Sequence, residues 1–125
     1  ALMLSQEYHG AARSLERAVE SVPDSLALEH ALARLLATCP AAEVRDGARA
    51  LEIAERVVAA ELTLDHAETV AMALAELGRF DEAVRWQERV LVHEQRLQTT
   101  PSPQRRSRLE LYRARRPVRA PWFDG

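Results

Sequence analysis

Lysine and asparagine are absent from this 125-residue sequence, and cysteine occurs only once, at Cys39. A lone cysteine excludes an intrachain disulfide framework and gives no reason to expect an oxidising compartment. No apolar run approaches the roughly 20 residues that a membrane-spanning helix needs. The opening Ala-Leu-Met-Leu has no basic segment before it, so it does not resemble a signal peptide. The cytoplasm is therefore the default compartment, and the sequence names no other.

The abundant residues favour closely packed helices. Hydrophobic residues make up 47% of the chain but aromatic residues only 5%. All seventeen positive charges are arginine. Residues 1–100 hold ten of them against seventeen acidic residues, whereas residues 101–125 hold seven against Glu110 and Asp124. The sequence thus describes one domain with an acidic body and a basic end, and segregated charge of this kind steers the choice of partner.

Apolar residues recur at helical spacing along the whole chain, and no stretch alternates as a β-strand does. The leucines between residues 28 and 36 form one apolar stripe, which Pro40 ends. Residues suited to cap or end helices are Asp24 or Ser25, Asp46, Gly78 and Ser102. Helices are expected at about 8–21, 64–77 and 81–97, after the tail of another helix at 1–6. Three more are expected: one from the cap at Asp24 or Ser25 to the loop that begins at Cys39, one that starts at the cap Asp46 and includes Ala50 to Val58, and one from Ser102 and Pro103 to the residues before Pro117.

The chain repeats itself at long range. Ala11, Ala50 and Ala83 each lie near the start of an amphipathic segment, with 39 and then 33 residues between them. Self-similarity near 34 residues, with a small residue where two helices touch, is typical of a helix-turn-helix solenoid.

Two segments resemble the tetratricopeptide repeat family. The residues that carry the resemblance are Gly78, Phe80, Ala83, Gln87 and Val90 in one, and Tyr8, Ala11, Leu15, Ala18 and Pro23 in the other. Ala50, Ala54 and Val57 keep the same steps between them. The segments 35–51 and 109–117 resemble a variant of the repeat, with its closing helix, found at the C-terminal end of bacterial tetratricopeptide proteins.

The resemblance implies an all-α, right-handed helix-turn-helix solenoid. Its array covers residues 1–100 in about two and a half repeats, followed by a capping helix and basic tail at 101–125. The repeats are expected at 1–24, 25–63 and 64–98. Because the sequence has no initiator methionine and begins within the pattern, we expect a fragment from the C-terminal end of a longer repeat protein.

In this family the first helix of each repeat lines a concave groove, and its exposed residues bind the ligand. By register, the partner-binding residues are His30, Arg34, Thr38, Asp65, Glu68, Met72 and Glu76. One arginine, one histidine and three carboxylates favour a peptide with positive charge or hydrogen-bond donors. The alternative is that these side chains are merely the solvated face of packed helices. The family's carboxylate clamp needs lysine and asparagine, which this chain lacks.

No arrangement typical of catalysis or metal binding is found in the sequence. The histidines His9, His30, His66 and His93 fall on four different expected helices, and none has another histidine four residues away. Cys39 is interpreted as a small packing residue rather than a nucleophile. We expect no enzyme activity, no cofactor and no metal.

The basic end has two interpretations. Its seven arginines, which would suffice for salt-sensitive binding of nucleic acid, are Arg105, Arg106, Arg108, Arg113, Arg115, Arg116 and Arg119. No base-stacking motif accompanies them. We favour a cap anchored by Leu109, Leu111 and Tyr112, with arginines that lie against the acidic body. Trp122 and Phe123 either pack on the last helices or form an exposed docking element.

The function that these patterns predict is non-catalytic protein–protein interaction, with a peptide or a partner helix bound in the groove. One alternative is a structural scaffold segment that forms a homodimer through an apolar N-terminal edge carrying Leu2 and Leu4. Binding of nucleic acid or another anionic surface by the arginine-rich end is the remaining alternative. The partner itself is not identified by the sequence.

Overall fold

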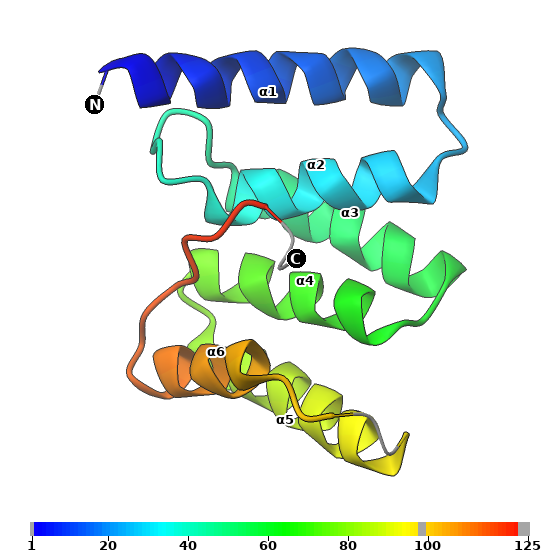
Figure 1. Cartoon of the computed structure of the whole chain (residues 1–125), viewed down its shortest axis with the longest axis vertical. Coiled ribbons are helices and arrows are strands. Elements are labelled where there is room, and N and C mark those ends of the chain that lie inside the picture. The colour runs from blue at the N-terminus through cyan, green and yellow to red at the C-terminus, as the bar shows by residue number, and fades with distance from the viewer. Residues whose placement is uncertain (1, 98–99, 123–125) are drawn as a thin grey trace.

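The computed structural model describes residues 2–97 and 100–122, with side chains from Gln6 onward. These residues form six α-helices and no strand (Figure 1). The helices are α1 (Leu2–Ser21), α2 (Leu26–Thr38), α3 (Gly47–Ala60), α4 (Leu64–Glu76), α5 (Phe80–Arg96) and α6 (Pro103–Arg113). The predicted all-α class is confirmed.

Each helix packs against the next one along the chain, and α2 also packs against α4. The result is a stack that begins with α1 and ends with α5 and α6, and in Figure 1 α3 lies behind α2. Packing between successive helices is expected where no single amphipathic helix can bury its apolar side alone. The tetratricopeptide identity and the right-handed superhelix stay predictions.

The helix boundaries follow the local signals in the sequence. Side-chain oxygens of Ser25, Asp46 and Ser102 accept hydrogen bonds from backbone N–H groups three residues later, at 3.2, 3.1 and 3.4 Å. Thr63 caps α4 in the same way, through the backbone N–H of His66 at 3.1 Å. Gly78 has a φ of 80°, which ends the α4 segment in the left-handed region that glycine tolerates.

The sequence predicts that one helix ends at about residue 6 and that another begins at about residue 8, and this prediction is wrong. α1 runs without interruption from Leu2 to Ser21. Residues 1–9 contain no proline or glycine, and glutamine and glutamate at positions 6 and 7 are good helix formers. Gly10 costs helix stability but does not end a helix when the turns on both sides continue it.

The main core is enclosed by α2, α3, α4 and α5, and it reaches Tyr112 on α6 and Val118 beyond it. Helix α4 is buried on every side, from His66 to Ala75 without a gap. Small residues such as Ala71 and Ala73 allow the neighbouring helices to approach this closely. A smaller cluster of Leu35, Cys39 and Val44 lies against α1.

The segment after α6 returns across the stack. In Figure 1 the red segment leaves α6 and runs up to the level of α2. Arg34 Nε on α2 donates a hydrogen bond to the backbone oxygen of Ala120 at 3.0 Å. Farther on, the ring of Trp122 stacks on Tyr8 of α1 with 6.2 Å between centroids. The C-terminal segment therefore contacts helices that are distant from it in sequence.

Candidate functional site

The predicted groove residues do lie on α2 and α4, but they are covered. Of the seven, the buried ones are His30, Arg34, Thr38, Glu68 and Met72. Glu76 is half-buried and Asp65 is exposed. The expected exposure is therefore contradicted for five of them, because α6 and residues 117–122 lie over this part of the molecule and bond to it. We call these seven residues together the inner face.

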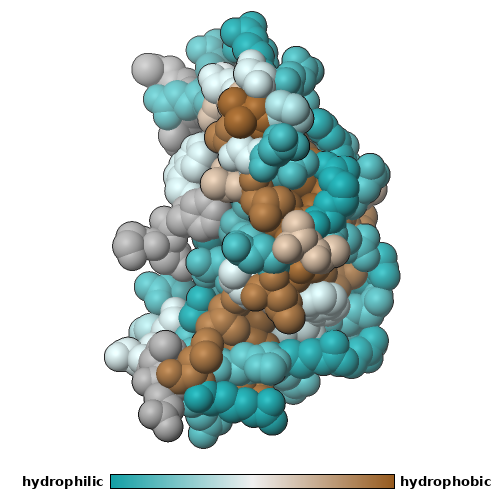
Figure 2. Space-filling model, turned by 90° about the vertical axis from the view of Figure 1, so that its right-hand side faces the viewer, coloured by the Kyte–Doolittle hydropathy of each residue, from teal (hydrophilic) through white to brown (hydrophobic). Residues whose placement is uncertain are grey.

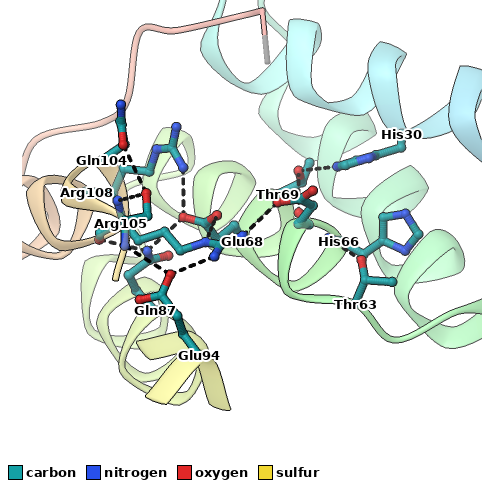
Figure 3. A network of polar contacts seen from close by, with 12 residues as sticks. His30, Thr63, His66, Glu68, Thr69, Gln87, Glu94, Gln104, Arg105 and Arg108 are labelled. Carbon is teal, nitrogen blue, oxygen red and sulfur yellow. Dashed lines mark hydrogen bonds and ion pairs between the residues drawn. The ribbon is translucent and has the colours of Figure 1, made fainter. Parts of the chain in front are cut away.

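Arg105 at the start of α6 is bound by three carboxylates. Its Nε donates to Glu68 Oε1 at 2.9 Å, one Nη to Glu94 Oε2 at 2.7 Å and the other Nη to Asp65 Oδ1 at 2.9 Å (Figure 3). Burial opposes the charge of this guanidinium, but the hydrogen bonds to Glu68, Glu94 and Asp65 raise its pKa above the usual value. The planar, five-donor guanidinium suits this three-sided arrangement of acceptors.

Glu68 is the centre of the network. Its Oε2 accepts hydrogen bonds from Arg108 Nη1 and from Gln87 Nε2, both at 2.9 Å. The side chains of Glu68 and Glu94 are each 4% exposed, and that of Arg108 is 7% exposed. A buried carboxylate is tolerated only when it is paired and hydrogen-bonded, and Glu68 meets both conditions through α6.

The sequence analysis missed Gln87 and Glu94, because it looked for binding residues only on the helices that became α2 and α4. Both lie on the buried stripe of α5, which continues as Ala83, Gln87, Val90 and Glu94 at steps of four, three and four. A signal in the sequence could have identified them: two polar residues interrupt an apolar stripe at helical spacing, which indicates buried polar side chains.

A second group of contacts holds the segment after α6. Glu76 at the end of α4 accepts from Arg119 at 2.8 Å and from Arg45 at 3.2 Å. Arg45 in turn donates to the backbone oxygen of Cys39 at 2.7 Å. Glu76 thus links the loop after α2 with the C-terminal segment, at the end of the inner face opposite to Asp65.

His30 and His66 form a buried pair at the other end of α2. Their rings meet edge to face with 4.6 Å between centroids. His30 Nε2 lies 2.6 Å from Thr69 Oγ1, whose hydroxyl donates to the backbone oxygen of Asp65 at 3.1 Å. Burial, helped by the nearby His66, lowers the pKa of His30 to about 4. His30 is therefore neutral at pH 7 and donates its Nε2–H to Thr69.

Metal-ligating side chains do not gather in the part of the chain that the structure describes. No group of three or more histidine, cysteine, aspartate or glutamate side chains is placed there to hold a metal ion. Burial raises the pKa of the Cys39 thiol, and this side chain packs with Leu35 and Val44 as a small apolar residue would. Over the same described ranges, no helix is both long enough and apolar enough to cross a bilayer.

The basic end folds onto acidic residues as predicted. Arg113 reaches Glu88 at 3.2 Å and Glu110 at 3.1 Å, in addition to the pairs of Arg105, Arg108 and Arg119 described above. Of the predicted anchors, Leu109 and Tyr112 are buried and Leu111 is half-buried.

The other predicted contact residues are placed only in part. Trp122 is expected either to pack on the last helices or to be exposed for docking. It is 53% exposed and its ring stacks on Tyr8 of the first helix. Phe123 and the side chains of Leu2 and Leu4 lie outside the described residues.

No family model matches this chain, and no curated protein or solved structure is significantly similar to it. The tetratricopeptide resemblance therefore remains a prediction, and any statement about function depends on the contacts within this chain.

Proposed function

We propose that this chain is a non-catalytic protein-interaction module whose inner face binds an arginine-bearing peptide segment. One observation carries the proposal: the chain's own residues 103–122 lie on α2, α4 and α5 and are held there by charged hydrogen bonds. The proposal requires no cofactor and no reaction. Its fold would be the tetratricopeptide array that the sequence resembles.

The chemistry of the inner face favours arginine over other residues. Glu68, Glu94 and Asp65 approach a single guanidinium from three sides. A lysine ammonium is a compact point charge without the planar set of donors that this geometry uses. Charge-assisted hydrogen bonds of this kind are about twice as strong as neutral ones. This arrangement supports the predicted preference for positively charged peptides.

The inner face also offers a contact that is independent of the peptide's side chains. Arg34 donates to the backbone oxygen of Ala120, in a segment that contains no helix. Any extended chain in this position would present the same carbonyl group. A backbone contact near one end and a guanidinium site near the other together define a binding mode for a short helix followed by an extended segment.

In this mode the C-terminal segment is a resident ligand that competes with any external one. A partner reaches the inner face only in the fraction of molecules whose own segment has left, and its apparent affinity falls by that fraction. Weakening the resident segment should therefore strengthen binding of the same segment supplied separately.

The test uses the full chain with Arg105→Ala and Arg108→Ala, titrated with a fluorescent peptide that has the sequence of residues 101–122. We expect this variant to bind the peptide at least about tenfold more tightly than the wild type does. Adding Glu68→Gln to the double variant should abolish the gain. Arg106→Ala is the matched control, because Arg106 is exposed and its side chain forms no hydrogen bond or ion pair among the described residues.

Circular dichroism shows whether the double variant folds. If it does not fold, hydrogen exchange of the wild type provides a second test. Excess peptide added to the wild type should speed hydrogen exchange of the α6 amides, because it displaces α6. A folded double variant that takes up no peptide, or unchanged exchange in the wild type, would show that these contacts only close the core.

The two alternative functions have less support in the contacts. The outer side of α1 exposes polar side chains at Gln6, Arg13, Arg17 and Glu20, which is unlike the apolar edge that a homodimer would use. Nucleic-acid binding would need free guanidiniums. Four of the seven arginines at this end, Arg105, Arg108, Arg113 and Arg119, are instead bonded to carboxylates of this chain.

A further inference from the structure

A second surface lies where the turn after α3, the start of α4 and the C-terminal half of α5 meet. Its lining is mostly apolar and encloses a cleft of about 480 Å³. The apolar lining residues are Leu62, Leu64, Ala67, Trp86, Val90 and Leu97. In Figure 2 an apolar band runs across the lower half of the face, with hydrophilic residues on both sides of it. We call this surface the α5 cleft.

Two leucines on the α5 cleft are unusually exposed. Leu62 is 78% and Leu97 63% exposed, and half-buried Trp86 lines the cleft with them. Single exposed leucines are ordinary on a protein surface. Two of them with a tryptophan in one continuous hollow instead mark a place where another surface docks, since tryptophan is enriched among the residues that dominate binding.

Two arginines and a histidine follow one side of this cleft. Arg89, His93 and Arg96 line it, and with Arg85 they are spaced by four, four and three residues, which places them on one side of α5. Among the residues that the structure describes, the side chains of Arg89, His93 and Arg96 make no hydrogen bond or ion pair, unlike those of Arg105 and Arg108.

Three of the four acidic residues of α5 already have a partner, and the fourth, Asp81, lies in the first turn of the helix, eight residues before Arg89. Glu82 is bound by Arg79 at 2.6 Å, and Glu88 is bound by Arg113 at 3.2 Å. Glu94 faces Arg105 on the inner side. The α5 cleft is therefore an apolar hollow bordered by uncompensated cations, in a chain whose net charge is −2.

We propose that the α5 cleft binds an amphipathic acidic helix of a protein partner. Apolar side chains at steps of three and four would enter the hollow between Leu62 and Leu97. Carboxylates beside them would meet Arg89 and Arg96. A helix suits the site because the cations are spaced along the axis of α5, so that a second helix beside it reaches each in turn. This charge preference is opposite to that of the inner face, and the proposal does not depend on the proposed function.

The probe is a model peptide of about 16 residues, with leucines along one helical stripe and glutamates on both sides of it. Its fluorescence anisotropy is measured against the full chain at low and at high salt. We expect binding that weakens with salt, and a loss of at least about tenfold for Arg89→Glu with Arg96→Glu. Leu62→Ser should also weaken binding, and since Leu62 is exposed the change leaves the core intact.

Arg13→Glu with Arg17→Glu is the matched control variant. This pair is also exposed and four residues apart on a helix, but neither residue lines the α5 cleft. Its affinity for the peptide should equal that of the wild type. A peptide with arginine in place of each glutamate should bind the Arg89→Glu, Arg96→Glu variant more tightly than it binds the wild type.

Four results would overturn the proposal. They are no binding by the wild type, equal binding of a scrambled peptide, an affinity that Arg89→Glu with Arg96→Glu leaves unchanged, and a cleft closed by a second copy of the chain. Sedimentation at rising concentration detects the last, as a dimer that Leu62→Ser dissociates.

Discussion

At the scale of single residues, two buried carboxylates account for the arrangement of the C-terminal segment. Glu68 and Glu94 lie inside the helical stack, where an unpaired charge would cost several kcal/mol. Arginines from α6 supply the missing partners, and Gln87 satisfies one more lone pair of Glu68. Replacing the whole network by apolar residues need not destabilise the chain, whereas breaking it on one side must.

Glu68→Gln should lower the free energy of unfolding by about 3 kcal/mol, because the change keeps the shape of the side chain but removes the buried negative charge that Arg105 and Arg108 both contact. Urea unfolding followed by circular dichroism measures the loss. The control is Glu88→Gln, whose exposed pair with Arg113 should contribute less than about 1 kcal/mol. Equal losses in the two variants would contradict this account of the network.

His30 should make stability depend on pH in a defined window. Because its folded pKa is about 4 and the usual value is 6.5, the unfolded chain takes up the proton first as pH falls. The contribution of His30 is full above pH 6.5 and is lost progressively toward pH 4. His66, Asp65 and Arg34 act on the same group.

We compare the wild type with His30→Gln, which can still donate to Thr69 but does not titrate. The unfolding free energy of the wild type should fall more steeply than that of the variant between pH 6.5 and pH 4. Parallel curves would exclude His30 as the titrating group.

At the scale of helices, capping residues and glycine set the positions of most helix ends. The caps at Ser25, Asp46 and Ser102 and the glycine at Gly78 are where the sequence places them, since each acts within a few residues of backbone. The predicted break near residue 7 failed because no local residue imposes it. The spacing of apolar residues predicts correctly that a helix forms here. The full length of α1 follows because no residue near position 7 ends the helix.

Gly10 and Gly78 should respond in opposite directions to alanine. Gly10 lies inside α1 with open space around its Cα, so Gly10→Ala should raise the unfolding free energy by about 0.5–1 kcal/mol. Gly78 has a φ of 80°, and Gly78→Ala should cost about 1–2 kcal/mol. Thermal unfolding of both variants measures these changes, and a gain at Gly78 would show that the turn after α4 can adopt another conformation.

At the scale of the whole molecule, the C-terminal segment connects parts of the stack that do not otherwise meet. Arg105 forms ion pairs with α4 and α5, and the backbone oxygen of Ala120 accepts a hydrogen bond from α2. The ring of Trp122 stacks on α1. A chain built only from neighbouring helical pairs would lose its order from either end independently. Here the segment that follows α6 reaches back to the first helix.

Native-state hydrogen exchange should rank the helices by burial. We expect α4 amides to exchange most slowly, because His66–Ala75 is buried without interruption. Helix α1 should exchange fastest, since none of its described side chains is fully buried. Arg105→Ala should speed exchange in α6, and Arg106→Ala should not. Slower exchange in α1 than in α4 would contradict this ranking.

The sequence by itself determined the helices, most of their ends and the basic character of residues 101–125. These features depend on apolar spacing, on caps and on composition, all of which act over a few residues. The tertiary structure alone decided that five of the seven predicted groove residues are buried. Arg34 meets a carbonyl 86 residues away, and Glu68 meets Arg108 over 40. Such contacts join residues that are far apart in the sequence and close together only in the folded chain. Burial requires each charge to have a partner, but no local sequence pattern specifies which residue that partner is.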